Sequence, residues 1–182
     1  PGQETAYLEL TKKRCRRMPL QYLTGEQEFM GLPFAVNEHV LIPRQDTEVL
    51  VEEAIQILKS EMPDADVLDL CTGSGCIGIS IHSFCPDTKV TGADISEEAL
   101  QVAKHNALQN QVSVNFVHSD LFSGISGKFD MIVSNPPYIP SKVIDTLMPE
   151  VRDHEPVGAL DGKEDGLYFY RKITEESVAH LN

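Results

Sequence analysis

Long hydrophobic runs, paired cysteines and positive charge are all scarce in this 182-residue chain. No apolar run approaches the ~20 residues that a membrane-spanning helix needs, so we expect no membrane span. The four cysteines (Cys15, Cys71, Cys76 and Cys85) contain no CxxC pair, and this spacing predicts reduced thiols in a cytoplasmic protein. Lys and Arg number 15 against 28 Asp and Glu, a formal net charge of −13. Such acidity argues against a large groove for nucleic acid, because that binding depends on many Lys and Arg contacts.

The few basic residues are unevenly placed, since five of the fifteen lie between Lys12 and Arg17. Two interpretations stay open for this basic cluster. It is either a solvated helix end, favoured near the C-terminal end of the helix dipole, or a docking patch for an acidic or RNA-bearing partner. The six histidines show neither metal-ligand spacing nor a Ser-His-Asp arrangement, so we expect no metal site.

Strand and helix patterns alternate through most of the chain. The segment 4–17 is predicted to be helical, the segment 20–42 to form a β-hairpin around Gly31, and a helix to begin with Asp46 as its N-cap. The later pattern predicts strands at 67–70, 89–93, 112–117 and 129–133, and helices at 75–84, 96–108 and 165–181. This alternation predicts an α/β fold, in which a parallel sheet has helices on both faces.

A glycine-rich segment follows the first strand of this predicted sheet. Residues 69–78 read Asp-Leu-Cys-Thr-Gly-Ser-Gly-Cys-Ile-Gly, and Asp94 ends the next strand. Glycines at such a turn let a ligand approach the backbone, and a carboxylate on the next strand can bind ribose hydroxyls. Asp69 would repel a pyrophosphate but would suit an ammonium or sulfonium group, although a turn or capping role for it stays open. The segment therefore favours S-adenosylmethionine (SAM) over NAD.

The tetrapeptide Asn135-Pro136-Pro137-Tyr138 follows the last predicted strand of the sheet. Each proline fixes its own φ and pushes the preceding residue into the extended region. The side-chain amide of Asn135 and the nearby backbone carbonyls should therefore face one way. Acceptors held in a row suit a planar NH2 group, which carries two donors. Side-chain amides and exocyclic base nitrogens are such groups, so the tetrapeptide predicts a site that aligns a weakly nucleophilic NH2.

These segments together resemble the ordered motifs of class I SAM-dependent methyltransferases: residues 69–75, Asp94, Ser119-Asp120-Leu121 and residues 135–138. More narrowly, nearly the whole chain resembles the HemK/PrmC family, the glutamine-N5 methyltransferases of peptide chain release factors. The narrower resemblance rests on three further stretches: Pro19 to Phe34, Leu41 to Glu48, and Glu155 to Arg171.

The resemblance implies an enzyme that transfers a methyl group from SAM to the side-chain amide nitrogen of the glutamine in the Gly-Gly-Gln motif of release factors. It thus implies protein methylation in translation termination, in the cytoplasm, with release factors as partners and no membrane or nucleic-acid substrate. By the same resemblance Asn135, Pro136 and Tyr138 are catalytic, and with Pro137 they bind the substrate amide. The cofactor-binding residues that it implies are Asp69, Cys71, Thr72, Gly73, Ser74, Gly75, Asp94, Asp120, Leu121 and Asn135.

Alternative functions remain open at this point. An adenine-N6 nucleic-acid methyltransferase would use the same tetrapeptide, because adenine N6 is also a planar NH2 group in a pocket. A ribosomal protein could replace the release factor as the glutamine substrate. A SAM- or dinucleotide-binding scaffold without chemistry would leave residues 135–138 unexplained.

The resemblance also predicts the domain organisation. Residues 1–19 would end an N-terminal helical domain, residues 20–42 would form a β-hairpin linker, and residues 43–182 would form the Rossmann-like SAM-binding domain. The chain opens at Pro1, and we count four parallel strands where the family has seven. We therefore expect a C-terminally incomplete domain and assign the activity to the parent protein, since this stretch alone could be inactive. Cys71 also departs from the family, which usually has glycine there, but we expect SAM binding to survive.

Overall fold

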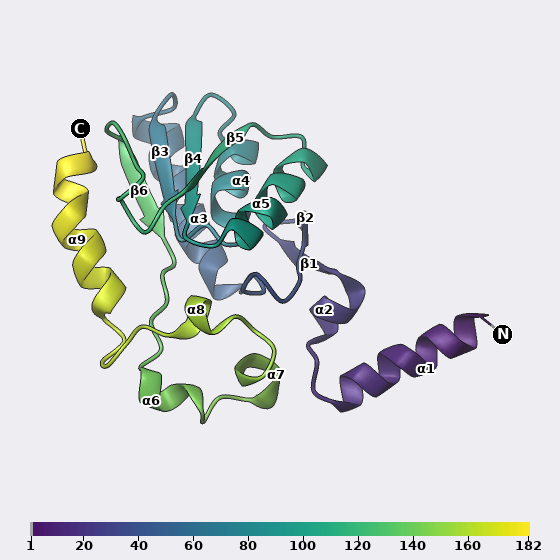
Figure 1. Cartoon of the computed structure of the whole chain (residues 1–182). Coiled ribbons are helices and arrows are strands. Elements are labelled where there is room, and N and C mark those ends of the chain that lie inside the picture. The colour runs from purple at the N-terminus through teal and green to yellow at the C-terminus, as the bar shows by residue number, and fades with distance from the viewer. Residues whose placement is uncertain (1) are drawn as a thin grey trace.

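The computed structural model describes residues 2–182 and has a four-stranded parallel sheet at its centre (Figure 1). Its strands run in the order β5-β4-β3-β6. The strands are β3 (Asp66–Leu70), β4 (Lys89–Asp94), β5 (Val114–His118) and β6 (Met131–Ser134). The predicted α/β fold and its four parallel strands are therefore confirmed.

Residues of the sheet enter two different cores, which lie on its two faces. Val67 and Val90 pack in the larger core with three helices: α3 (Asp46–Glu61), α4 (Cys76–Phe84) and α5 (Glu97–Gln109). Leu68 and Leu70 pack in the smaller core with the loop after β5 and with Ile173 of α9 (Tyr168–His180). Both faces are thus covered, as the buried apolar runs of a parallel sheet require.

The N-terminal segment differs in part from the prediction. Helix α1 (Gly2–Cys15) extends away from the sheet and buries none of its described residues (Figure 1). The hairpin is confirmed only over β1 (Glu26–Phe29) and β2 (Leu32–Ala35). The first part of the segment predicted as a hairpin is instead the short helix α2 (Leu20–Thr24). Gly25 ends this helix in the left-handed conformation, φ 79°, and its N–H donates to the Gln21 carbonyl.

Several predicted boundaries also move by one to three residues. Helix α3 starts at Asp46 as predicted, but Gln45 occupies the N-cap position, and no side chain caps the helix. The predicted Ser96 cap of α5 is confirmed, because its hydroxyl accepts the N–H of Ala99 at 3.1 Å. Helix α9 starts at Tyr168 rather than residue 165, after Gly166 with its φ of 79°.

The connection from β6 to α9 contains three short helices that the sequence did not predict. They are α6 (Ser141–Ile144), α7 (Pro149–Arg152) and α8 (Val157–Leu160). The connection returns to the tetrapeptide, because the Ile139 amide donates to the Leu160 carbonyl and the Gly162 amide to the Ile139 carbonyl. It therefore forms a closed loop beside the end of β6. All four cysteines are free thiols, and no helix within residues 2–182 is long and apolar enough to cross a bilayer.

Candidate active site at the carboxyl edge of the sheet

The candidate site lies where the strand order reverses. The chain moves from β3 outward to β4 and β5, and then returns to place β6 on the other side of β3. The carboxyl ends of β3, β4 and β6 therefore meet at one edge, which is the position where open parallel sheets bind ligands. This edge carries the glycine loop (residues 71–75), Asp94 and residues 135–138.

The glycine loop takes up a backbone that favours glycine and is tied to Asp94. Cys71, Gly73 and Gly75 have positive φ angles of 58°, 55° and 81°. The Gly73 amide donates to Asp94 Oδ2 at 2.8 Å, and the Ser96 amide donates to Asp94 Oδ1 at 2.9 Å. Burial raises the pKa of Asp94, whereas these two N–H groups lower it. Asp94 thus links the ends of β3 and β4 directly.

Asp69 lies beneath the glycine loop and is completely buried. Its Oδ2 accepts the Thr72 hydroxyl at 2.6 Å and the Gly78 amide at 3.0 Å, whereas Oδ1 has no hydrogen-bond partner within residues 2–182. Burial raises the pKa of this carboxyl to about 7, although both hydrogen bonds lower it. Asp69 thus makes the contacts of a turn residue. This role is the alternative to ligand binding that the sequence left open.

Asn135 points its amide donor at a neighbouring helix. Its Nδ2 donates to Thr47 Oγ1 of α3 at 3.2 Å, and its Oδ1 forms no hydrogen bond within the described chain. Pro136 and Pro137 are buried, and Tyr138 is 55% exposed. The half-buried Asn135 therefore keeps a free acceptor on a loop that two buried prolines hold in place. Thr47 had no predicted role, although it lies in the stretch that resembles the family.

A pocket of about 450 Å³ opens beside Asn135 and Tyr138. Its walls come from the start of α3, the end of β6, the connection from β6 to α9, and Tyr170 of α9. The lining residues are Leu41, Arg44, Asp46, Thr47, Leu50, Ser134, Asn135, Tyr138, Ile139, Leu147, Val151, Ala159, Leu160 and Tyr170. Apolar residues and polar or charged residues line the pocket in about equal number, and polar groups that converge on a cavity are typical of a small-molecule or side-chain site. The sequence did not predict its outer wall, Leu147 to Leu160.

An ion pair anchors this outer wall to the pocket. Arg44 Nη2 donates to both carboxylate oxygens of Glu155, at 2.6 and 2.8 Å. The Glu155 side chain is only 2% exposed and that of Arg44 is 40% exposed, so the carboxylate depends on this guanidinium for compensation. Burial raises the pKa of Glu155 and the hydrogen bond from Arg44 lowers it. Glu48, in contrast, accepts the Met30 amide and so holds the hairpin turn against α3.

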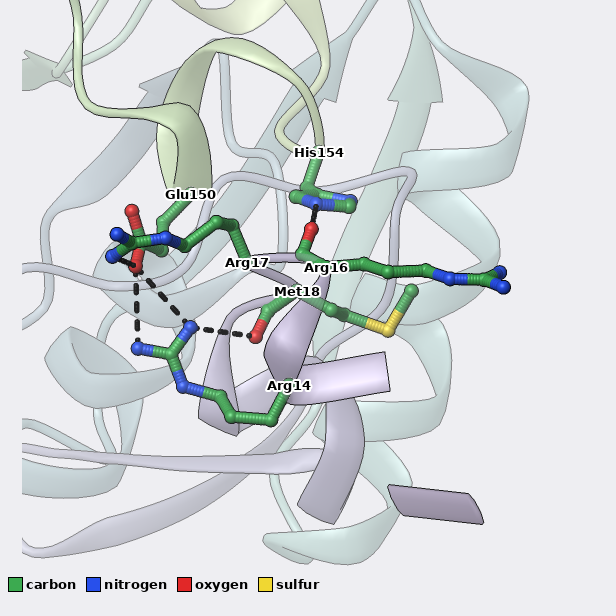
Figure 2. Close-up of polar contacts among 6 residues, drawn as sticks. All are labelled: Arg14, Arg16, Arg17, Met18, Glu150 and His154. Atoms are coloured by element: carbon green, nitrogen blue, oxygen red, sulfur yellow. Dashed lines mark hydrogen bonds and ion pairs between the residues drawn. The ribbon is translucent and has the colours of Figure 1, made fainter. Parts of the chain in front are cut away.

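The basic cluster reaches the same wall from outside (Figure 2). Arg14 and Arg17 both donate to Glu150 Oε1 of α7 at 3.2 Å, and the Arg16 carbonyl lies 3.1 Å from His154 Nε2. The Arg16 side chain extends away from Glu150 in this view. Part of the basic cluster thus forms contacts with α7 and His154 of the same chain. Neither interpretation of the sequence predicted such contacts.

Asp120 and Leu121 lie at a different pocket, of about 430 Å³, between the loop after β5 and α9. Asp120 is exposed, and Leu121 has a φ of 47° in a turn where the Ser119 hydroxyl donates to the Leu121 carbonyl. Residues of the glycine loop line neither pocket. The structure therefore brings residues 71–75 and Asp94 together by hydrogen bonds, and it gives Asn135 and Asp120 separate cavities.

Solved structures share this fold. A methyltransferase from Pyrococcus furiosus superimposes with a TM-score of 0.59 at 21% identity, covering 94% of this chain and 74% of that one. A tRNA (uracil-54, C5)-methyltransferase from Pyrococcus abyssi gives 0.53 at 18% identity, covering 82% and 36%. Together with the strand order and the glycine loop, these likenesses show the fold class: a Rossmann-like α/β domain.

Sequence comparison narrows the class. Residues 46–150 match the model of the family described as "Methyltransferase small domain", so the chain belongs to this family. It is 47% identical over 175 residues to a release factor glutamine methyltransferase from Fusobacterium nucleatum, covering 94% of this chain and 49% of that protein. It is 45% identical over 183 residues to one from Geobacter sulfurreducens, covering 100% and 63%. The chain thus spans between about half and two thirds of the length of these relatives.

Proposed function

We propose that this chain forms the cofactor- and amide-binding core of a SAM-dependent glutamine-N5 methyltransferase that acts on peptide chain release factors. The names of the relatives support the reaction and the substrate. The observation that carries the proposal is Asn135, whose Nδ2 donates to Thr47 while its Oδ1 is free to accept beside a pocket at the sheet's carboxyl edge. An acceptor in this position suits an incoming NH2 group.

The residues at the edge of the sheet fit the proposed cofactor. The glycine loop contains no Lys or Arg, and the Asp94 carboxylate accepts the Gly73 amide of the loop. A ligand with pyrophosphate would meet unfavourable charge here, whereas one with a ribose and a cationic end would not. Asp94 would accept ribose hydroxyls with the lone pairs that Gly73 and Ser96 leave free. When bound, SAM supplies the methyl group.

The chain's own contribution to the reaction would be alignment. Asn135 Oδ1 and the Pro136 carbonyl would accept the two N–H bonds of the glutamine amide, while Tyr138 and the buried Pro137 support the loop. An amide lone pair is delocalised, so its reactivity must come from being held in line with the methyl carbon. Positioning of this kind can contribute on the order of 7–11 kcal/mol to lowering the barrier. The proton that leaves the nitrogen after transfer would pass to water.

The domain organisation remains part of the proposal. Residues 1–19 would belong to a helical region, residues 20–42 would link it to the main domain, and residues 43–182 would bind the cofactor. We place the activity in the cytoplasm with release factors as partners. An adenine substrate has less support, because the net charge of −13 opposes strand binding and Arg14 and Arg17 already contact Glu150.

The test is a methyl-transfer assay with the parent protein, SAM and an unmethylated bacterial release factor, followed by peptide mass spectrometry. We expect one methyl group on the glutamine of the Gly-Gly-Gln motif. Asn135→Ala should abolish transfer but leave SAM affinity within a few-fold, because its side chain would bind the substrate amide. Parallel reactions should contain a ribosomal protein, duplex DNA and single-stranded DNA. Methyl on adenine would mean that the substrate is wrong, and a loss of SAM binding in the variant would mean that the role of Asn135 is wrong.

A further inference from the structure

A completely buried asparagine connects the glycine loop to the β-hairpin. Asn106 lies near the C-terminal end of α5, four residues before the C-cap Asn110, and has 0% exposure. Its Nδ2 donates to the Ser74 carbonyl of the loop at 2.9 Å and to the Ala35 carbonyl of β2 at 3.1 Å. Its Oδ1 accepts the Ala35 amide at 2.7 Å. Both donors and an acceptor of this side chain are therefore used, and they join three separate elements.

Helix α5 approaches the glycine loop so closely that the facing positions, Gly75 and Ala103, need small residues. A Cβ added to Gly75 would lie 3.2 Å from Ala103 Cβ of α5 and 2.8 Å from Ile79 Cδ1. Ser74 itself is only 2% exposed. The glycine loop therefore packs against α5. Because Ser74 is buried, water cannot easily replace the hydrogen bond that its carbonyl accepts from Asn106 Nδ2.

Asparagine is a poor choice for a helix interior unless its side chain has a specific partner. An apolar residue at position 106 would leave three groups without their partner: the buried Ser74 carbonyl and both backbone groups of the half-buried Ala35. The contacts of Asn106 are thus directional, and one of them reaches the proposed cofactor loop.

We propose that Asn106 is a positioning residue of the proposed methyltransferase, which holds the glycine loop in its ligand-accepting conformation and ties it to the β-hairpin. The inference rests on the proposed function only for the identity of the ligand. Asn106 touches no reacting atom in this arrangement and acts through the Ser74 carbonyl. Asn106 thus contacts the hairpin and the glycine loop with one side chain.

Asn110 provides a matched control on the same helix. Its Nδ2 donates to the Pro33 carbonyl of the hairpin and to the Asn106 carbonyl, both at 2.9 Å. It therefore ties α5 to the same hairpin without touching the glycine loop. Asn110→Ala should lose a hairpin contact and leave the loop unchanged.

The experiment compares the parent protein with its Asn106→Ala and Asn110→Ala variants, well below each melting temperature. Two quantities are measured: the affinity for S-adenosylhomocysteine by calorimetry, and hydrogen exchange at the amides of residues 72–75 without ligand. We expect Asn106→Ala to weaken binding by roughly tenfold or more and to speed exchange in the loop. Asn110→Ala should change neither, although both variants lower the melting temperature.

If both variants show the same loop exchange and the same affinity as the parent, Asn106 is only a structural residue and the proposal is overturned. If Asn106→Ala does not fold, Asn106→Asp serves as the second variant, because it keeps the volume and the acceptor for Ala35 but removes the donors. If the unsubstituted protein binds no S-adenosylhomocysteine, the proposed function fails. Loop exchange then decides the role of Asn106 by itself.

Discussion

At the scale of single residues, the site depends on polar groups whose contacts are only partly satisfied. Asn135 has a free acceptor, and Asp69 has a buried oxygen without a partner among the described residues. An unpaired buried oxygen is costly when charged, which is why burial raises the pKa of Asp69. A substantial fraction of Asp69 is therefore protonated in the folded protein near neutral pH.

This gives Asp69 a pH-dependent effect on stability. Its pKa is about 7 in the folded protein against 3.8 for an ordinary aspartate, so the folded state binds the proton more tightly. Between about pH 4 and 7 the unfolded chain has lost this proton and the folded chain has kept it, so the contribution of Asp69 to stability falls as pH rises.

Asp69→Asn should remove this contribution. We expect the free energy of unfolding of the parent, relative to the variant, to fall by up to about 4 kcal/mol between pH 4 and 7. Urea denaturation of both proteins across this range measures the difference. Parallel curves would mean that Asp69 is charged in the folded protein throughout.

At the scale of elements, the connection from β6 to α9 decides the shape of the pocket. It supplies Leu147, Val151 and Leu160 to the lining, and it is held by Arg44 at Glu155 and by Arg14 and Arg17 at Glu150. The two attachments differ in strength, because Glu155 is buried and the arginines at Glu150 are 45% and 64% exposed. Exposed ion pairs are weak and are screened by salt.

Arg44→Ala should therefore loosen the pocket wall by leaving Glu155 buried without its partner. We expect a loss of about 1–3 kcal/mol in the free energy of unfolding and a higher KM for the protein substrate. SAM affinity should change little, because Arg44 does not contact the glycine loop. Arg17→Ala is the matched control, with a small stability effect that vanishes in 1 M salt. An equal effect of both variants on KM would contradict the distinction between the two attachments.

At the scale of the whole molecule, the sheet with its helices forms the body and α1 contributes little to it. Helix α1 extends from the body and has no buried residue (Figure 1). Its contact with the rest of the chain includes Arg14 at Glu150, whereas Arg17 lies beyond the helix. Most of the stability of the body should then be independent of this helix.

Deletion of residues 2–15 should therefore leave the melting temperature within a few degrees, since surface changes of this kind cost little. The circular dichroism signal should lose only the contribution of one helix. A large drop in melting temperature would mean that α1 packs on the body in solution. Scanning calorimetry of the parent and the deletion variant makes this comparison.

The sequence by itself determined the α/β class, the order of its main elements and the composition of the glycine loop and of residues 135–138. Hydrophobic periodicity and turn residues are local signals, so they can be read without a fold. Only the tertiary structure decided three side-chain contacts. They are the hydrogen bonds of Asn135 with Thr47, of Arg44 with Glu155, and of Asn106 with the Ser74 carbonyl. Each of these contacts joins residues 32 to 111 positions apart, and a helical or polar pattern says nothing about which distant group a side chain will meet. The short helix α2 was missed for a related reason, since five residues are too few to show a period.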